Sequence, residues 1–264
     1  MLTLALISEI TVKGDIMKVL GILCSPHKKG NSAIMLAKAL AAASERGAEV
    51  ETVWLNEKNI HGCNDCRACL KTEKCRIKDD MTELYEQVME ANAIIFATPV
   101  YYCGLPGPAK SFLDRLHPLA MHNKLSGKIG ASLIVASSIG HESTWSQLNF
   151  FFSFTHMVCA DHVFGFAWNS GDVRKDRYAM LSSKELGRQV VALAEQHYRF
   201  PEEWPGPIHT YVLSRYGADS CPAMNTRWTE QMVGGEETKG FLQQHKLGMN
   251  KTRVKPSLTK NRKP

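Results

Sequence analysis

Short apolar runs alternate with longer amphipathic segments between residues 18 and 198. The apolar runs predict strands at 18–25, 48–55, 93–102, 127–138 and 159–168. Between them, apolar residues recur at helical spacing and predict helices at 30–47, 79–91, 108–117, 144–157 and 175–198. Strands that alternate with helices of this length predict a parallel five-stranded sheet covered on both faces, which is the doubly wound α/β class.

The same pattern divides the chain into three parts. Residues 18–199 form the sheet domain, into which a cysteine-rich loop is inserted at 61–78. Residues 1–17 form a leader of doubtful role that lacks the basic start and cleavage signal of a secretory peptide, and Met17 is an alternative start. Residues 200–264 are rich in proline and aromatic residues without a clear period, so we expect an irregular extension that ends in a basic tail.

Composition and charge exclude several classes of protein. Hydrophobic residues make up 44% and charged residues 22% of the chain, as in globular proteins. No apolar run approaches the roughly 20 residues that span a bilayer, so we expect a cytoplasmic protein with no membrane partner. The net charge of +6 lies in the tail, because residues 238–264 carry eight Lys and Arg and no acid, which leaves −2 for the rest. A solvated terminus is therefore favoured over a nucleic-acid partner.

The loop SPHKKGNS at 25–32 joins the first strand to the first helix. A helix N-terminus presents free N–H groups and a positive dipole to an anion, and the side chains of Ser25, Asn31 and Ser32 add donors. Asn31 or Ser32 is expected to cap the helix. The loop lacks the dinucleotide and nucleoside-triphosphate motifs, and Gly30 stands where a phosphatase loop needs arginine. Phosphate binding is favoured over an ordinary strand-to-helix turn.

Two further loops follow the third and fourth strands. Ligands of doubly wound sheets bind beyond the carboxyl ends of the strands. The end of the third strand and the loop that follows it offer backbone polar groups and tyrosine rings that suit a flat heteroaromatic ligand, although the tyrosines alone are also consistent with simple packing. The residues of this stretch are Thr98, Pro99, Val100, Tyr101, Tyr102 and Gly104. The loop after the fourth strand, with Ser138 and Gly140, is close enough in this topology to reach the same ligand.

Four of the eight cysteines fall within thirteen residues. Cys63, Cys66 and Cys69 are spaced two residues apart, and Cys75 follows after five more. Overlapping two-residue spacings let one loop wrap round three corners of an iron-sulfur cube, whereas structural zinc usually draws two separated pairs. A 4Fe-4S cluster is favoured over zinc and over thiols without a metal. Asp114 and Arg115 are predicted to hold a helix or a subunit contact and to take no part in chemistry.

Together these motifs resemble a known family. SPHKKGNS and the later ATPVYYCGLPGPAKSFLDR are similar to the flavodoxin-like NAD(P)H-dependent FMN reductases, and the cysteine run resembles their iron-sulfur flavoprotein branch. The resemblance covers residues 18–116 and, by pattern alone, 127–198. It implies a homo-oligomer, either a dimer or a tetramer, and a 4Fe-4S cluster on the four cysteines.

The resemblance also implies an FMN whose phosphate lies in the loop at 25–32. The residues expected to contact it are Ser25, His27, Gly30, Asn31, Ser32, Thr98, Pro99, Val100, Tyr101, Tyr102, Gly104, Ser138 and Gly140. The family commonly has arginine after the Ser-Pro pair, where this chain has His27. Imidazole binds phosphate less firmly than guanidinium, so we expect weaker retention of FMN.

We therefore predict an oxidoreductase with FMN and a 4Fe-4S cluster that passes electrons between two-electron and one-electron partners. NAD(P)H is a candidate donor, and the other partner is expected to be a small molecule or a ferredoxin-like protein. No side chain is required as acid, base or nucleophile. The alternatives are an NAD(P)H-dependent FMN or quinone reductase without a cluster, a flavodoxin-type electron carrier without catalysis, and a nucleic-acid-binding flavoprotein.

Overall fold

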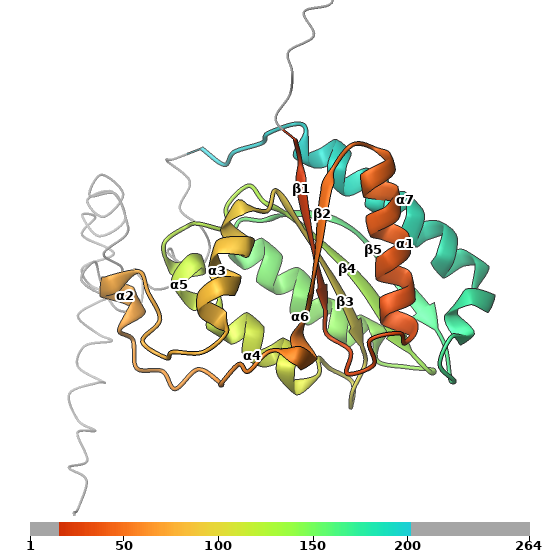
Figure 1. The fold of residues 1–264 in the computed structure, drawn as a ribbon, viewed down its shortest axis with the longest axis horizontal. Helices are drawn as coiled ribbons and strands as arrows, with labels where there is room; N and C mark the ends of the chain where they lie inside the picture. The colour runs from red at the N-terminus through yellow and green to blue at the C-terminus, as the bar shows by residue number, and fades with distance from the viewer. Residues whose placement is uncertain (1–15, 202–264) are drawn as a thin grey trace, which may run out of the picture.

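A computed structural model describes residues 16–201, and these form the predicted sheet (Figure 1). The strands are β1 (Lys18–Leu23), β2 (Glu49–Trp54), β3 (Ala93–Pro99), β4 (Ile129–Ala136) and β5 (Val158–Phe166). They are all parallel and lie in the order β2-β1-β3-β4-β5. The five-stranded doubly wound prediction is confirmed, whereas almost all of the predicted leader and C-terminal extension lies outside the described residues.

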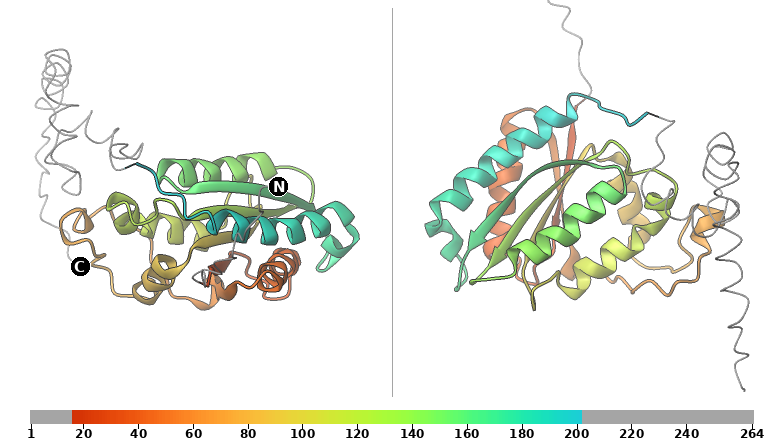
Figure 2. Two further views of the ribbon diagram at one scale, coloured as in Figure 1. Left: turned by 90° about the horizontal axis from the view of Figure 1, so that it is seen from above. Right: turned by 180° about the vertical axis from the view of Figure 1, so that it is seen from behind.

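Helices cover both faces of the sheet (Figure 2). One face packs against α1 (Asn31–Glu45) and α7 (Arg177–Ala194). The other packs against α3 (Met81–Glu90), α4 (Gly107–Arg115), α5 (His117–Met121) and α6 (His141–Phe154). The short elements are the 3-10 turns η1 (Leu55–Glu57) and η2 (Asp172–Lys175) and the single-turn helix α2 (Cys69–Thr72). No helix among the described residues is long and apolar enough to cross a membrane.

The central strands form because they are buried on both faces. In β1, Val19 and Leu23 enter the core beneath α1 and α7, whereas Leu20 and Ile22 enter the core on the opposite face. All of β4 is buried, so its sequence is a continuous apolar and small-residue run. The edge strand β2 is mostly exposed, which accounts for its alternating charged residues.

Helices α1 and α7 pack unusually closely at Gly187. A Cβ atom built at Gly187 would overlap the carbonyl oxygen of Ala39 and lie 2.7 Å from its carbonyl carbon. Only glycine allows this approach, so the helix pair depends on the absence of a side chain at this position.

Three details of the helices differ from the prediction. The N-cap of α1 is Gly30, with no side-chain cap. Asn31 does not cap the helix because its side chain amide donates to the carbonyl of Asn169 (3.0 Å) and accepts from the N–H of Gly171 (2.9 Å). The helix predicted at 108–117 is divided into α4 and α5, since Pro118 in the first turn of α5 cannot continue the hydrogen bonding of α4. Helix α6 begins earlier than predicted, at His141.

Candidate functional site

The loops that follow β1, β3 and β4 lie at one edge of the sheet, because the carboxyl ends of parallel strands share an edge. The chain leaves β1 toward β2 on one side, while β3 lies on its other side. This reversal is the topological switch point at which doubly wound proteins bind ligands. The three predicted ligand loops are therefore brought together.

The loop between β1 and α1 is a tight turn with free amides. The N–H of Gly30 donates to the carbonyl of His27 (3.0 Å), and the N–H of His27 donates to the buried Ser25 hydroxyl (3.1 Å). The first bond of the helix runs from the N–H of Ile34 to the carbonyl of Gly30 (3.1 Å). The three amides before Ile34 have no helical partner and present an anion site at the positive end of α1.

The side chains of this loop differ in how accessible they are to a ligand. His27 is exposed, whereas Ser32 is buried and the Asn31 side chain bonds to the loop after β5. The indole N–H of Trp54 donates to the carbonyl of Ser25 (2.8 Å) and fixes the start of the turn. The predicted contacts of Ser25, His27, Asn31 and Ser32 with a phosphate stay predictions.

The segment after β3 forms a narrow hairpin in a strained conformation. Tyr101 and Gly104 exchange two backbone hydrogen bonds of 2.9 and 3.1 Å. Between them, Tyr102 and Cys103 have φ values of 47° and 57°, in the left-handed region that side chains disfavour. Tyr102 is fully exposed at the tip, whereas Thr98 is fully buried. Strain of this kind clusters at ligand sites, and the hairpin leaves the Tyr102 ring fully exposed at its tip.

The loop after β4 packs directly on this hairpin. Gly140 is the N-cap of α6 with a φ of 95°, and a Cβ there would lie 2.7 Å from Val100 Cγ1 and 3.1 Å from Cys103 Cα. The Ser143 hydroxyl donates to the carbonyl of Cys103 (2.6 Å). The hairpin and this loop therefore form one wall, and Ser138 is exposed beside it.

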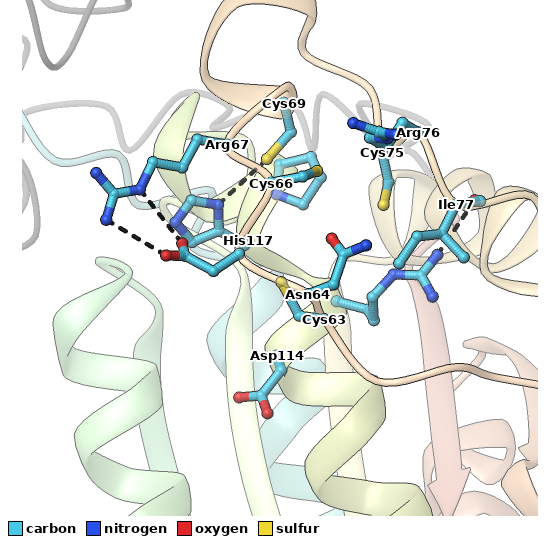
Figure 3. Close-up of a pocket in the computed structure, with 13 residues that line it drawn as sticks. Cys63, Asn64, Cys66, Arg67, Cys69, Cys75, Arg76, Ile77, Asp114 and His117 are labelled. Carbon is cyan, nitrogen blue, oxygen red and sulfur yellow. Dashed lines mark hydrogen bonds and ion pairs between the residues drawn. The ribbon is translucent and has the colours of Figure 1, made fainter. Parts of the chain in front are cut away.

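The four clustered cysteines line one cavity of about 50 Å³ (Figure 3). Cys69 is buried at the start of α2, Cys66 and Cys75 are half-buried, and Cys63 is exposed. The irregular segment wraps round the cavity because Asp65 and Arg67 adopt left-handed φ values of 50° and 57°. All four cysteines therefore border one cavity, and their role as metal ligands stays a prediction.

Two histidines, one in α5 and one at its C-cap, contact Cys69. His117 Nδ1 lies 3.4 Å from the Cys69 sulfur, and His122 Nε2 lies 2.9 Å from the Cys69 carbonyl oxygen. Burial raises the pKa of the Cys69 thiol, and the nearby charges of the other three cysteines raise it further. Burial lowers the pKa of His117. Four thiolates around one cavity therefore repel each other unless cations offset their charge.

The donor set fits an iron-sulfur cluster. Within residues 16–201 no three or more His, Cys, Asp and Glu side chains converge to hold a single metal ion. All four thiols nevertheless border the same cavity. A cluster suits this arrangement because its iron atoms are spread over several corners and each takes one thiolate.

Arg115 is predicted to hold a helix or a subunit contact. Its side chain is buried, which excludes a subunit contact, and it lines the cysteine cavity at the end of α4. It forms an ion pair with Asp79, whose side chain is also fully buried. The burial of Arg115 was indicated in the sequence, because Arg115 follows Phe112 by three residues and so lies on the apolar face of α4. Neither His117 nor His122 carried a comparable signal.

The five-stranded parallel sheet with helices on both faces defines a flavodoxin-like protein. Residues 17–169 match the model of the NADPH-dependent FMN reductase family. An iron-sulfur flavoprotein of Archaeoglobus fulgidus is 35% identical over 184 residues, which cover 69% of this chain and 83% of that protein. An iron-sulfur flavoprotein of Methanocaldococcus jannaschii is 32% identical over 189 residues, covering 68% of this chain and 98% of the relative.

A solved structure confirms the fold. RosB with bound 8-demethyl-8-formylriboflavin-5'-phosphate aligns with a TM-score of 0.57 at 17% identity, over 68% of this chain and 79% of that one. The chain belongs to the NADPH-dependent FMN reductase family, in its iron-sulfur flavoprotein branch, and the predicted resemblance is confirmed. It is a flavin-dependent oxidoreductase.

Proposed function

We propose that this protein carries both FMN and a 4Fe-4S cluster and passes electrons between a two-electron partner and one-electron partners. The observation that supports the proposal most strongly is the cavity lined by Cys63, Cys66, Cys69 and Cys75. When bound, the flavin exchanges one or two electrons and the cluster exchanges one at a time. The work of this chain is to bind both groups, orient them and restrict water.

The FMN phosphate is proposed to bind the free amides at the start of α1, with His27 and the Ser25 hydroxyl beside them. The ring is proposed to lie along the wall formed by the hairpin at 101–104 and the loop at 138–140. Val100, Gly104 and Gly140 shape this wall, and Tyr102 is available to cover the ring. Thr98 and Pro99 support the hairpin from the end of β3.

Helix α4 connects the two proposed sites. It begins at Gly107, directly after the hairpin, and it ends at Arg115, which lines the cysteine cavity. Its nine residues span about 13 Å. A single rigid element therefore separates the proposed flavin wall from the proposed cluster.

NAD(P)H is proposed as the two-electron donor because the family model is that of NADPH-dependent FMN reductases. A small molecule or a ferredoxin-like protein is proposed as the one-electron partner. A homo-oligomer is also proposed, since Phe150, Phe166 and Trp168 are large apolar side chains that are more than half exposed. The second candidate function, a reductase of the same family without a cluster, is favoured by a family description that names only FMN.

The test compares Cys66→Ser with Cys159→Ser, an exposed cysteine on β5 outside the cavity. The proteins are purified without oxygen and analysed for iron, acid-labile sulfide, zinc and FMN. The unmodified protein should hold about four iron and four sulfide per chain. Cys66→Ser should lose the iron and keep the FMN, whereas Cys159→Ser should match the unmodified protein.

Other results would contradict the proposal. If the unmodified protein contains FMN but no iron or sulfide, the second candidate function, a reductase without a cluster, is supported instead. Zinc in place of iron would identify a structural metal site. Loss of FMN with retention of iron in Cys66→Ser would contradict the separation of the two sites.

A further inference from the structure

Arg115 is a charged residue in a position that normally excludes charge. It is the last residue of α4, and it is only 1% exposed. Burying a guanidinium is unfavourable unless its N–H groups and its charge are satisfied. Its contacts therefore indicate what the residue is for.

The guanidinium joins the two ends of the cysteine segment. One nitrogen, Nη1, donates to the carbonyl of His61 (2.8 Å) and to Asp79 Oδ2 (2.6 Å), while Nη2 donates to Asp79 Oδ1 (2.9 Å). A longer contact of 3.4 Å joins Nη2 to the carbonyl of Ile77. His61 precedes Cys63 by two residues and Ile77 follows Cys75 by two. One side chain thus fixes the chain on both sides of the four cysteines.

The partners of Arg115 are themselves anchored. Asp79 Oδ2 accepts a hydrogen bond from the N–H of His61 (2.9 Å), and Asp79 Oδ1 accepts one from the N–H of Met81 (3.2 Å). The Tyr85 hydroxyl on α3 donates to the backbone carbonyl of Arg115 (2.6 Å). Arg115 is held at the meeting point of α3, α4 and both ends of the segment.

One donor of Arg115 is left over. Its Nε is buried and has no hydrogen-bond partner among the described residues. Buried N–H groups are nearly always paired, so an orphaned one indicates an acceptor at the site. Arg115 lines the same cavity as the four cysteines, so their sulfurs are among the acceptors at this site, together with Asn64, Asp65 and Asp114.

We propose that Arg115 is a positioning residue for the cluster. It holds the cysteine segment round the cavity, and its Nε–H donates to a cysteine thiolate or to a sulfide of the cluster. The ion pair of Arg115 with Asp79 carries no net charge, so the proposed contribution is this hydrogen bond and the closure of the segment. This inference rests on the proposed function and extends it to a residue outside the cysteine motif.

The main test is Arg115→Lys. This variant keeps the positive charge beside Asp79 but loses the two-nitrogen contact of the guanidinium and the Nε donor. Loss of a partner outside the ligand set typically weakens metal binding by about tenfold or more, so iron release to a chelator should be about tenfold faster. The midpoint potential of the cluster should be lower, because the more negative reduced form loses a hydrogen bond. FMN content should equal that of the unmodified protein.

Two further variants complete the comparison. Arg46→Met removes a half-exposed arginine that pairs with Glu195 (2.7 Å), and it should change neither quantity. Arg115→Met combined with Asp79→Asn removes the guanidinium without leaving a buried carboxylate unpaired. This double variant should release iron faster still. Both quantities are measured without oxygen, by chelator absorbance and by an EPR-monitored redox titration.

The outcomes separate this inference from the proposed function. If the unmodified protein holds iron and sulfide and Arg115→Lys matches it in release rate and potential, only the inference is overturned. A parallel loss of FMN and iron from Arg115→Lys would indicate a general support of the fold and would also overturn it. An unmodified protein without iron or sulfide overturns both.

Discussion

Asp79 is a fully buried carboxylate whose charge depends on its neighbours. Burial on its own would raise the pKa, but hydrogen bonds from Arg115 and from the N–H of His61, together with attraction to the guanidinium, outweigh it. They lower the pKa from 3.8 to about 2. A carboxyl with a depressed pKa stabilises the fold above its unfolded pKa, and this contribution is lost as the pH falls through the folded pKa.

We therefore expect the free energy of unfolding of the metal-free protein to fall as the pH decreases from about 4 to about 2. Asp79→Asn should flatten this acid dependence. At neutral pH it should lower the free energy by about 3–5 kcal/mol, because it leaves Arg115 buried without a counter-charge. Denaturant unfolding at several pH values measures both effects.

Asp114→Asn is the matched control, since Asp114 pairs with Lys110 on the surface of α4. Exposed pairs contribute about 0–1 kcal/mol, so this variant should keep the acid dependence of the unmodified protein. An equal effect of the two substitutions would refute the assignment to Asp79.

His27 is expected to limit the affinity of the protein for FMN. It is exposed in the loop at 25–32, directly after the Ser25-Pro26 pair. His27→Arg adds a permanent charge and a forked donor, so FMN should bind about tenfold more tightly at neutral pH. Fluorescence titration of the flavin measures the dissociation constant. His197→Arg places the same charge outside the loop, and a similar gain there would indicate a general charge effect.

At the scale of residues, motif spacing predicted what was local. The four cysteines were found because their spacing lies within one segment, and the loop at 25–32 because it directly precedes a helix. Arg115 was misinterpreted because its partners His61 and Asp79 are more than thirty residues away in sequence. Asn31 was misinterpreted for the same reason, since Asn169 and Gly171 come from the far end of the sheet.

Among the elements, the pair α1 and α7 gives the sharpest prediction. Gly187→Ala places a methyl group against the carbonyl of Ala39, so the helices must move apart. We expect the free energy of unfolding to fall by about 1–3 kcal/mol, as measured by denaturant unfolding. Gly107→Ala, whose added Cβ meets nothing within 4 Å, should be neutral or slightly stabilising. Equal stability of the two variants would show that the helices tolerate separation.

The long elements were predictable because burial on one or both faces gives each a clear period. The short ones were not. Helix α2 has four residues and α5 has five, too few to establish a helical period. The hairpin at 101–104 was predicted as the end of a strand, because Tyr101 and Tyr102 are typical strand residues and nothing local signals a left-handed turn.

For the whole molecule, the parallel sheet and its two helical layers followed from the alternation of strands and helices, whereas the order of the strands comes from the structure. A parallel sheet places the loops after β1, β3 and β4 at one edge without any knowledge of side chains. It does not place the cysteine segment, which has little regular structure and is positioned by contacts with α3, α4 and α5. The location of the second site was therefore available only from the structure.

Helix α4 has a consequence for regulation of the molecule. Because one stiff rod begins at the hairpin and ends at the cysteine cavity, a displacement at either end moves the other end with it. The proposed flavin site and the cysteine cavity thus lie at the two ends of one helix. Natural variation in the length of this rod would tune the spacing of the two redox centres in steps of about 1.5 Å per residue.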